Sequence, residues 1–257
     1  MDNKPAPHWL LLRGLARESA HWGAFVPLLQ AAFPEVRITL LDLPGTGHHY
    51  QDPSPSQLHA ITTTVRDHAH ANGYLQQPVT VLAISLGAMV AWDWQQRYPT
   101  EISNAILINP SFASLSPFYL RLRWQCYPKF LALICQRDLL KRERAILQLV
   151  SRCRDHDDAN SQAWAHIQQL RPVSLGNMLR QIIAAAHYRP QDLPPQIPIL
   201  LLSGLGDQLV SPRCADAIQQ QWQLPIRRHP WAGHDLTLDD GAWVIAQLKD
   251  WVIRTTA

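Results

Sequence analysis

Short aliphatic runs alternate with longer amphipathic stretches in the first part of the chain. The aliphatic runs predict strands at residues 8–13, 36–41, 79–83 and 105–108. Hydrophobic positions at helical spacing between them predict helices at residues 21–33, 56–71 and 86–97. Strands that alternate with helices in this way predict right-handed crossovers onto a parallel sheet with helices on both faces.

The alternation stops after Ser111. Residues 117–188 show helical patterns without a convincing strand. The later pattern predicts strands at residues 197–203 and 226–229 and helices at residues 214–222 and 243–253. We therefore expect an α/β core formed by residues 1–112 and 191–257, interrupted by a helical cap at residues 113–190.

The strand predicted at residues 79–83 runs directly into Ser85, and a helix begins immediately after it. Two small residues, Ala83 and Gly87, stand two positions before and after the serine. A turn this sharp strains its central residue and needs small neighbours, because larger ones would collide with the strand and the helix. The segment therefore predicts a nucleophilic hydroxyl held above the end of the sheet.

The segment Ala83-Ile-Ser-Leu-Gly87 resembles the nucleophile elbow, Gly-x-Ser-x-Gly, of the α/β-hydrolase superfamily, with Ala83 in place of the first glycine. Two later segments, which contain Asp207 and His234, resemble the acid and histidine loops of the superfamily. The order Ser85, Asp207, His234 is also the one that the superfamily uses. The resemblance covers essentially the whole chain and implies a capped serine hydrolase. Because the first strand begins by residue 8, the implied sheet is a shortened one of about six parallel strands.

The resemblance implies a role for each of the three residues. Ser85 attacks the acyl carbon, His234 takes the proton of the serine, and Asp207 orients the imidazole. All three follow strands, and the loops after strands share one rim of a parallel sheet, so these residues can converge. Asp42 also ends a strand and is the alternative acid, although its surroundings resemble a structural loop of the superfamily. Asp235, directly after His234, is expected to be solvated rather than catalytic.

The oxyanion hole is expected to consist of backbone N–H groups. One donor is that of Leu86, which follows the nucleophile, and the other is that of Leu15, which follows the first strand. Arg13 stands where the superfamily more commonly has histidine, so a permanent cation lies near the site. Candidate substrate contacts are Arg13, Trp22 and Trp124, with core packing as the alternative for Trp22.

Composition narrows the class of protein. With 47% apolar and 17% charged residues, the chain resembles globular proteins rather than disordered ones. Its apolar runs are too short to span a bilayer, and its N-terminal segment carries no export signal, so we expect a cytoplasmic location. The four cysteines show no zinc-ligand spacing. No metal or organic cofactor is expected, because the nucleophile, the base and the oxyanion donors are all protein groups.

Positive charge is concentrated in the predicted cap. Residues 113–190 contain twelve Lys and Arg against five Asp and Glu, a net charge of +7, whereas the rest of the chain carries −4. A solvated helical surface is one explanation, and an acidic partner or substrate is the other. Arg137, Lys141 and Arg144 recur at i, i+4 and i+7, which predicts one cationic helix face. The overall charge of +3 does not by itself indicate nucleic-acid binding.

These features predict a serine hydrolase that cleaves small carboxylic esters through an acyl-enzyme. The chain is also similar in size and layout to the pimeloyl-acyl-carrier-protein methyl ester esterase of biotin synthesis, which suggests an acidic acyl-carrier protein as a partner of the basic cap. The first alternative is therefore a thioesterase or esterase for acyl groups bound to a carrier protein or to CoA. The second is a non-catalytic member of the superfamily that binds a ligand or a partner.

Overall fold

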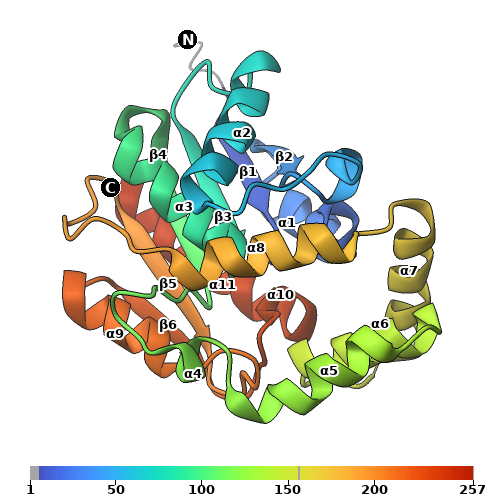
Figure 1. Cartoon of the computed structure of the whole chain (residues 1–257). Helices are drawn as coiled ribbons and strands as arrows, with labels where there is room; N and C mark the ends of the chain where they lie inside the picture. The colour runs from blue at the N-terminus through green and yellow to red at the C-terminus, as the bar shows by residue number, and fades with distance from the viewer. Residues whose placement is uncertain (1–5, 156, 257) are drawn as a thin grey trace.

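The structure, a computed structural model, describes residues 6–155 and 157–256. Six strands form one sheet in the order β2-β1-β3-β4-β5-β6, and every neighbouring pair is parallel (Figure 1). The strands are β1 His8–Leu12, β2 Arg37–Leu41, β3 Val79–Ile84, β4 Ile102–Ile108, β5 Ile199–Gly204 and β6 Ile226–His229. The structure thus confirms the expected sheet of about six parallel strands.

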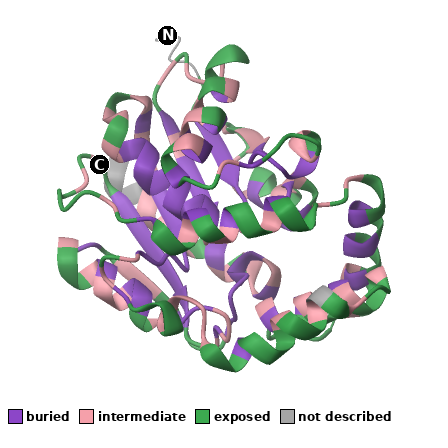
Figure 2. Ribbon diagram, viewed as in Figure 1, coloured by how far each residue is buried: buried purple, intermediate pink, exposed green. Residues whose placement is uncertain are grey.

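Helices cover both faces of the sheet. Those on one face are α2 Leu58–Ala71, α3 Leu86–Arg97 and α9 Arg213–Trp222, and those on the other are α1 Phe25–Ala32 and α11 Gly241–Thr256. Successive residues of β1 point to opposite faces: Leu10 packs in the core with α2 and α3, and Leu11 packs in the core with α1 and α11. Burial on both faces explains the continuous aliphatic runs, and Figure 2 shows the resulting buried centre.

Residues 113–190, the inserted helices, lie between β4 and β5. They contain α4 Phe118–Arg121, α5 Tyr127–Cys135, α6 Leu139–Val150, α7 Asp157–Leu170 and α8 Leu175–His187. α5, α6 and α7 lie to one side of the sheet, whereas α8 crosses in front of it (Figure 1). No helix within the described residues, inserted or not, is long and apolar enough to cross a membrane.

The helix expected at residues 21–33 is divided into two parts. Residues Ser19–Trp22 form a 3₁₀ turn, and α1 begins only at Phe25. Gly23 separates the two with φ of 49°, a left-handed conformation that favours glycine and ends the helical pattern. The hydrophobic spacing continues through this break, and for that reason it predicted a single helix.

The cationic stripe predicted through Arg137, Lys141 and Arg144 is not formed. α6 begins after Asp138, whose side chain caps the helix by accepting a hydrogen bond from the N–H of Lys141 at 3.1 Å. Arg137 therefore precedes the helix, and Arg144 is ion-paired with Asp158 of α7. The prediction was wrong because an acidic cap residue starts the helix two residues later than the charge spacing requires.

Candidate active site

Ser85 occupies the sharp turn between β3 and α3. Its backbone has φ of 56° and ψ of −113°, a strained conformation for a residue with a side chain, and its N–H donates to the carbonyl of Ile108 at 2.9 Å. A Cβ atom at Gly87 would lie 2.7 Å from the carbonyl oxygen of Leu12 and 2.5 Å from that of Arg13. The turn can therefore pack against β1 only because residue 87 is glycine.

Asp207 and His234 form a buried pair in the loops after β5 and β6. Oδ2 of Asp207 lies 2.6 Å from Nδ1 of His234, and the two residues are 1% and 5% exposed. The other carboxylate oxygen, Oδ1, accepts hydrogen bonds from the N–H groups of Leu209 and Val210 at 2.8 and 2.9 Å. Because a carboxylate only accepts hydrogen bonds, Nδ1 carries the proton of the neutral imidazole. Nε2 therefore has a free lone pair that can accept a further proton.

Asn109, at the end of β4, holds the backbone of the histidine loop. Its side-chain amide donates to the carbonyl oxygens of His234 and Gly233 at 2.8 and 3.3 Å, and its Oδ1 accepts from the N–H of Gly204 at 3.0 Å. Its φ of 48° turns the chain away from the strand. Asn109 was not among the residues predicted for the site, although an Asn-Pro pair directly after a strand is a signal for such a turn.

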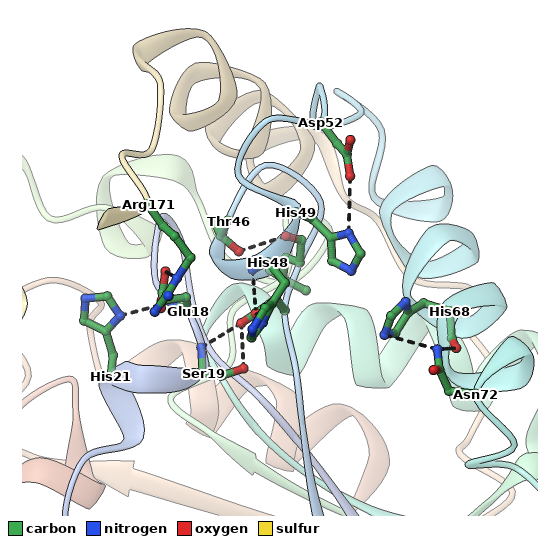
Figure 3. Close-up of polar contacts among 12 residues, drawn as sticks. Glu18, Ser19, His21, Thr46, His48, His49, Asp52, His68, Asn72 and Arg171 are labelled. Atoms are coloured by element: carbon green, nitrogen blue, oxygen red, sulfur yellow. Dashed lines mark hydrogen bonds and ion pairs between the residues drawn. The ribbon is translucent and has the colours of Figure 1, made fainter. Parts of the chain in front are cut away.

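Asp42, the alternative acid, holds a different loop. Its Oδ1 accepts from the N–H and the hydroxyl of Ser19 at 2.7 and 2.6 Å, and its Oδ2 accepts from the N–H of His48 at 3.0 Å. A Cβ atom at Gly47 would lie 2.0 Å from Oδ2, so the loop wraps closely around the carboxylate. Ser19 and His48, the two residues that donate these hydrogen bonds, are labelled in Figure 3. These contacts are those of a structural residue.

A cavity of about 260 Å³ brings the core and the inserted helices together. Ser85 and His234 line one part of it. The opposing walls are mostly apolar and come from α5, α6, α7 and α8, for example Phe130, Leu133, Ile146, Trp164 and Met178. The cavity therefore offers an apolar space directly beside a serine hydroxyl and an imidazole.

The structure places only one of the three candidate substrate contacts on this cavity, namely Arg13. Trp22 is 3% exposed and packs on Phe25 within the core, with ring centres 5.8 Å apart. Trp124 is 64% exposed and lies outside the cavity lining. The structure thus bears out the core packing considered for Trp22, which lies beneath α1. The expectation that Trp124 lines the site is wrong, because its side chain points to solvent.

Two backbone N–H groups near Ser85 have no acceptor within the part of the chain that the structure describes. Leu86 is the first residue of α3, where an N–H has no partner within the helix. A Cβ atom at Gly14 would lie 3.2 Å from Cβ of Ser85, so the loop after β1 passes directly against Ser85. In this loop the N–H of Ala16 donates to Oε1 of Gln181 at 2.9 Å, whereas that of Leu15 has no acceptor among the described residues. Leu15 and Leu86 are thus available as a pair of donors.

Comparison with known families agrees with this geometry. The sequence profile of the Alpha/beta hydrolase family matches residues 9–247, which include the turn at Ser85, the Asp207–His234 pair and all the inserted helices. The chain belongs to the Alpha/beta hydrolase family. No curated protein matches its sequence.

Solved structures share this fold over nearly the whole length of the alpha/beta hydrolase. An esterase from Thermogutta terrifontis is 18% identical with a TM-score of 0.73, covering 98% of this chain and 91% of that one. An esterase from Rhodococcus sp. ECU1013 is 16% identical with a TM-score of 0.74, covering 96% and 90%. A protein provisionally assigned as a non-heme bromoperoxidase, from Mycobacterium tuberculosis H37Rv, is 20% identical with a TM-score of 0.75, covering 99% and 95%. At such identities the likeness shows the fold alone.

Arg13 of this alpha/beta hydrolase pairs with Asp235, the residue expected to be solvated. Nη2 of Arg13 lies 2.5 Å from Oδ2 of Asp235, both side chains are 4% exposed, and the guanidinium lies 4.9 Å from the ring of Trp22. The prediction for Asp235 was wrong because it did not foresee an arginine 222 positions away as a partner. The ion pair joins the residue before Gly14 to the residue after His234, and so connects two loops of the site.

The pKa of Asp235 reflects this pairing. Burial alone would raise the pKa, but the charge and the hydrogen bond of Arg13, with further bonds from Thr237 and Leu238, hold it below its ordinary value. The pair therefore contributes stability above about pH 4, which is lost as the pH falls through the lowered pKa.

We expect Asp235→Asn to lower the free energy of unfolding by about 3 kcal/mol at pH 7, because it leaves the Arg13 charge buried without a counter-ion. The difference from the wild type should begin to shrink below about pH 4, where the carboxylate of the unfolded wild type takes up a proton, and should be lost as the pH falls through the lowered pKa of folded Asp235. Urea unfolding at both pH values measures the two effects. Asp216→Asn is the control, because Asp216 pairs with Arg228 on the surface and should cost less than about 1 kcal/mol. Equal losses in both variants would contradict the buried pair.

Further ion pairs fasten the inserted helices to the loop after β1. Nη1 of Arg17 lies 2.7 Å from Oε2 of Glu143 on α6, and the Arg17 guanidinium lies 4.5 Å from the ring of Trp164. Figure 3 shows Arg171, just beyond α7, reaching Glu18, which is 3% exposed; the two are ion-paired. The burial of Glu143 was not predicted, because nothing in the charged run around it indicates an inward-facing side chain.

The described residues include no group of three or more His, Cys, Asp and Glu side chains placed to hold a metal ion. Among them, His49 and His68 make a ring contact with centres 4.8 Å apart, and Nδ1 of His49 lies 3.2 Å from Oδ2 of Asp52 (Figure 3).

Proposed function

We propose that this chain hydrolyses carboxylic esters through an acyl-enzyme formed on Ser85. The observation that carries the proposal is the placement of Ser85, at a strained turn, on the same cavity as His234, whose Nδ1 is held 2.6 Å from Asp207. A serine hydroxyl becomes a nucleophile when a base accepts its proton, and an oriented neutral imidazole is such a base.

The proposed reaction has two halves. Oγ of Ser85 attacks the acyl carbon while Nε2 of His234 takes the hydroxyl proton, and the N–H groups of Leu15 and Leu86 stabilise the oxyanion that forms. The tetrahedral adduct then expels the alcohol, which receives that proton from His234. Water then attacks the acyl-enzyme and gives a proton to His234. The second tetrahedral adduct breaks the bond between the acyl carbon and Oγ of Ser85, His234 returns the proton to Oγ, and the acid and free Ser85 are released.

We further propose that the inserted helices act as a cap over a core formed by residues 1–112 and 191–257. Their apolar side chains Phe130, Leu133 and Ile146 face the same cavity as Ser85, so they are placed to contact the acyl group. The buried pair of Glu143 with Arg17 and the half-buried pair of Arg171 with Glu18 would hold this cap against the core. Small acyl esters are therefore the proposed substrates.

Acyl groups carried by CoA or by an acidic acyl-carrier protein are the second candidate substrates. The net charge of +7 on residues 113–190 favours them, because both carriers are anionic. A hydrolase of either kind would still use Ser85. Comparing kcat/KM for an acyl-CoA with that for the neutral ester of the same acid separates the two candidates.

A fluorophosphonate probe tests the proposal directly, because it reacts only with an activated serine. We expect one adduct per chain, located at Ser85 by peptide mass spectrometry, together with turnover of p-nitrophenyl acetate and butyrate. Ser203→Ala is the matched control and should label fully, since the Ser203 hydroxyl lies buried on β5. A folded protein with neither label nor turnover would instead be the non-catalytic binding protein.

A further inference from the structure

The helix α5 is apolar on both of its sides. Phe130 and Leu133 face the cavity, whereas Tyr127 and Leu131, which do not line it, are 39% and 66% exposed. Lys129 is the only charged residue of the helix. A surface helix normally has one polar side, and a helix that is apolar all round is normally buried. The outer side of α5 is thus an apolar surface that the described part of this chain leaves uncovered.

Neighbouring residues extend this surface. Phe118 and Tyr119 of α4 and Trp124, just before α5, are 71%, 48% and 64% exposed. We define the outer apolar face by these exposed side chains: Phe118, Tyr119, Trp124, Tyr127 and Leu131. It follows α4 and α5 along the lower edge of the molecule, where Figure 2 shows mostly exposed residues. Five large apolar side chains exposed within fourteen residues exceed the scattered single exposures that are normal for a soluble surface.

Cations accompany the outer apolar face. Residues 113–150 contain seven Lys and Arg against two Asp and Glu. Lys129, Arg137 and Lys141 are exposed, and no described residue forms an ion pair with any of them, whereas Arg144 is paired with Asp158. The segment that carries the outer apolar face therefore also carries exposed cations without ion-pair partners among the described residues.

We propose that the outer apolar face docks on an anionic lipid surface. Tryptophan and tyrosine favour the boundary between hydrocarbon and water, and lysine and arginine there pair with anionic head groups. A second copy of this chain is a poorer occupant, because a face-to-face contact would bring two sets of like charges together. A folded acidic protein would need a separate pocket for each protruding side chain, whereas a lipid surface adapts to them.

This binding does not depend on the proposed ester hydrolysis, although it would place α5 between the lipid and the cavity. Its test therefore omits catalysis. The full chain is sedimented with vesicles of diether phosphatidylglycerol, which contains no ester to cleave, and with vesicles of diether phosphatidylcholine. We expect about tenfold or stronger preference for the anionic vesicles, and a loss of about tenfold in affinity when the salt is raised to about 0.5 M.

Variants separate the apolar from the ionic contribution. We expect Leu131→Ser and Trp124→Ser each to weaken binding about tenfold or more, and Leu28→Ser, at a 50% exposed leucine of α1, to leave it unchanged. Lys129→Gln should weaken binding to the anionic vesicles about fivefold, whereas Lys249→Gln on α11 should not. Urea midpoints check that every variant is folded.

Three outcomes would overturn the proposal. One is the absence of sedimentation with phosphatidylglycerol, and another is an equal loss of binding in Leu131→Ser and Leu28→Ser. The third is a concentration-dependent dimer of the wild type in analytical ultracentrifugation that Leu131→Ser dissociates, which would show that a second copy covers the face. Failure of Ser85 to react with a fluorophosphonate would leave the lipid result untouched, so the two proposals fail separately.

Discussion

Replacement of Ser85 by alanine is expected to lower kcat for p-nitrophenyl butyrate by about 10⁶-fold, which is the scale seen when the nucleophile of a Ser-His-Asp site is removed. Alanine has no hydroxyl to attack the acyl carbon, yet it adopts φ of 56° no less readily than serine does, so the turn should persist. The cavity is also unchanged apart from one oxygen atom. We therefore expect the loss to fall on turnover rather than on folding.

The measurement combines steady-state rates with urea unfolding. His234→Ala should lose a similar factor, and the double variant should be no slower than either single one, because the two residues act as a unit. Ser203→Ala should keep the wild-type rate. Retention of more than about a tenth of the wild-type rate by folded Ser85→Ala would end the assignment of Ser85 as the nucleophile.

The sheet could be predicted from the sequence because burial on both faces leaves an unambiguous pattern. β6 occupies the predicted residues 226–229, and α3 begins and ends where the spacing indicated. The predictions failed at helix ends, where a single residue determines whether the helix begins or stops. Gly23 divides the helix expected at residues 21–33, and Asp138 delays α6 beyond Arg137. Hydrophobic spacing carries no information about either position.

The sequence allowed the loops that form the candidate site to be predicted, but not the ion pairs within it. Ser85, Asp207 and His234 each follow a strand, so the parallel topology alone brings them to one rim. The pairs formed by Arg13 with Asp235 and by Arg17 with Glu143 could not be predicted. They join residues that are 222 and 126 positions apart in the sequence. Both pairs also require buried charged side chains, and charged residues are normally expected on the surface. The catalytic roles themselves stay predictions.

Asp207→Asn is expected to lower kcat by about 10⁴-fold, a smaller loss than that of Ser85→Ala. Each carboxylate oxygen of Asp207 now accepts hydrogen bonds, Oδ2 from His234 and Oδ1 from the N–H groups of Leu209 and Val210. An amide has only one acceptor oxygen. If that oxygen faces the backbone N–H groups, the amide NH₂ faces Nδ1 of His234, and the imidazole proton moves to Nε2. A protonated Nε2 cannot accept the proton of the Ser85 hydroxyl.

Asp42→Asn is the matched control, since it also replaces a buried carboxylate in a loop after a strand. Asp42 accepts from Ser19 and His48 rather than from His234, so its loss should lower the urea midpoint while kcat stays within about threefold of the wild type. Rates and urea midpoints for the two variants, measured side by side, decide between the acids. A fully active Asp207→Asn together with a folded but inactive Asp42→Asn would show that the other carboxylate orients the histidine. The contacts of the two carboxylates favour Asp207, because only its oxygen reaches the imidazole of His234.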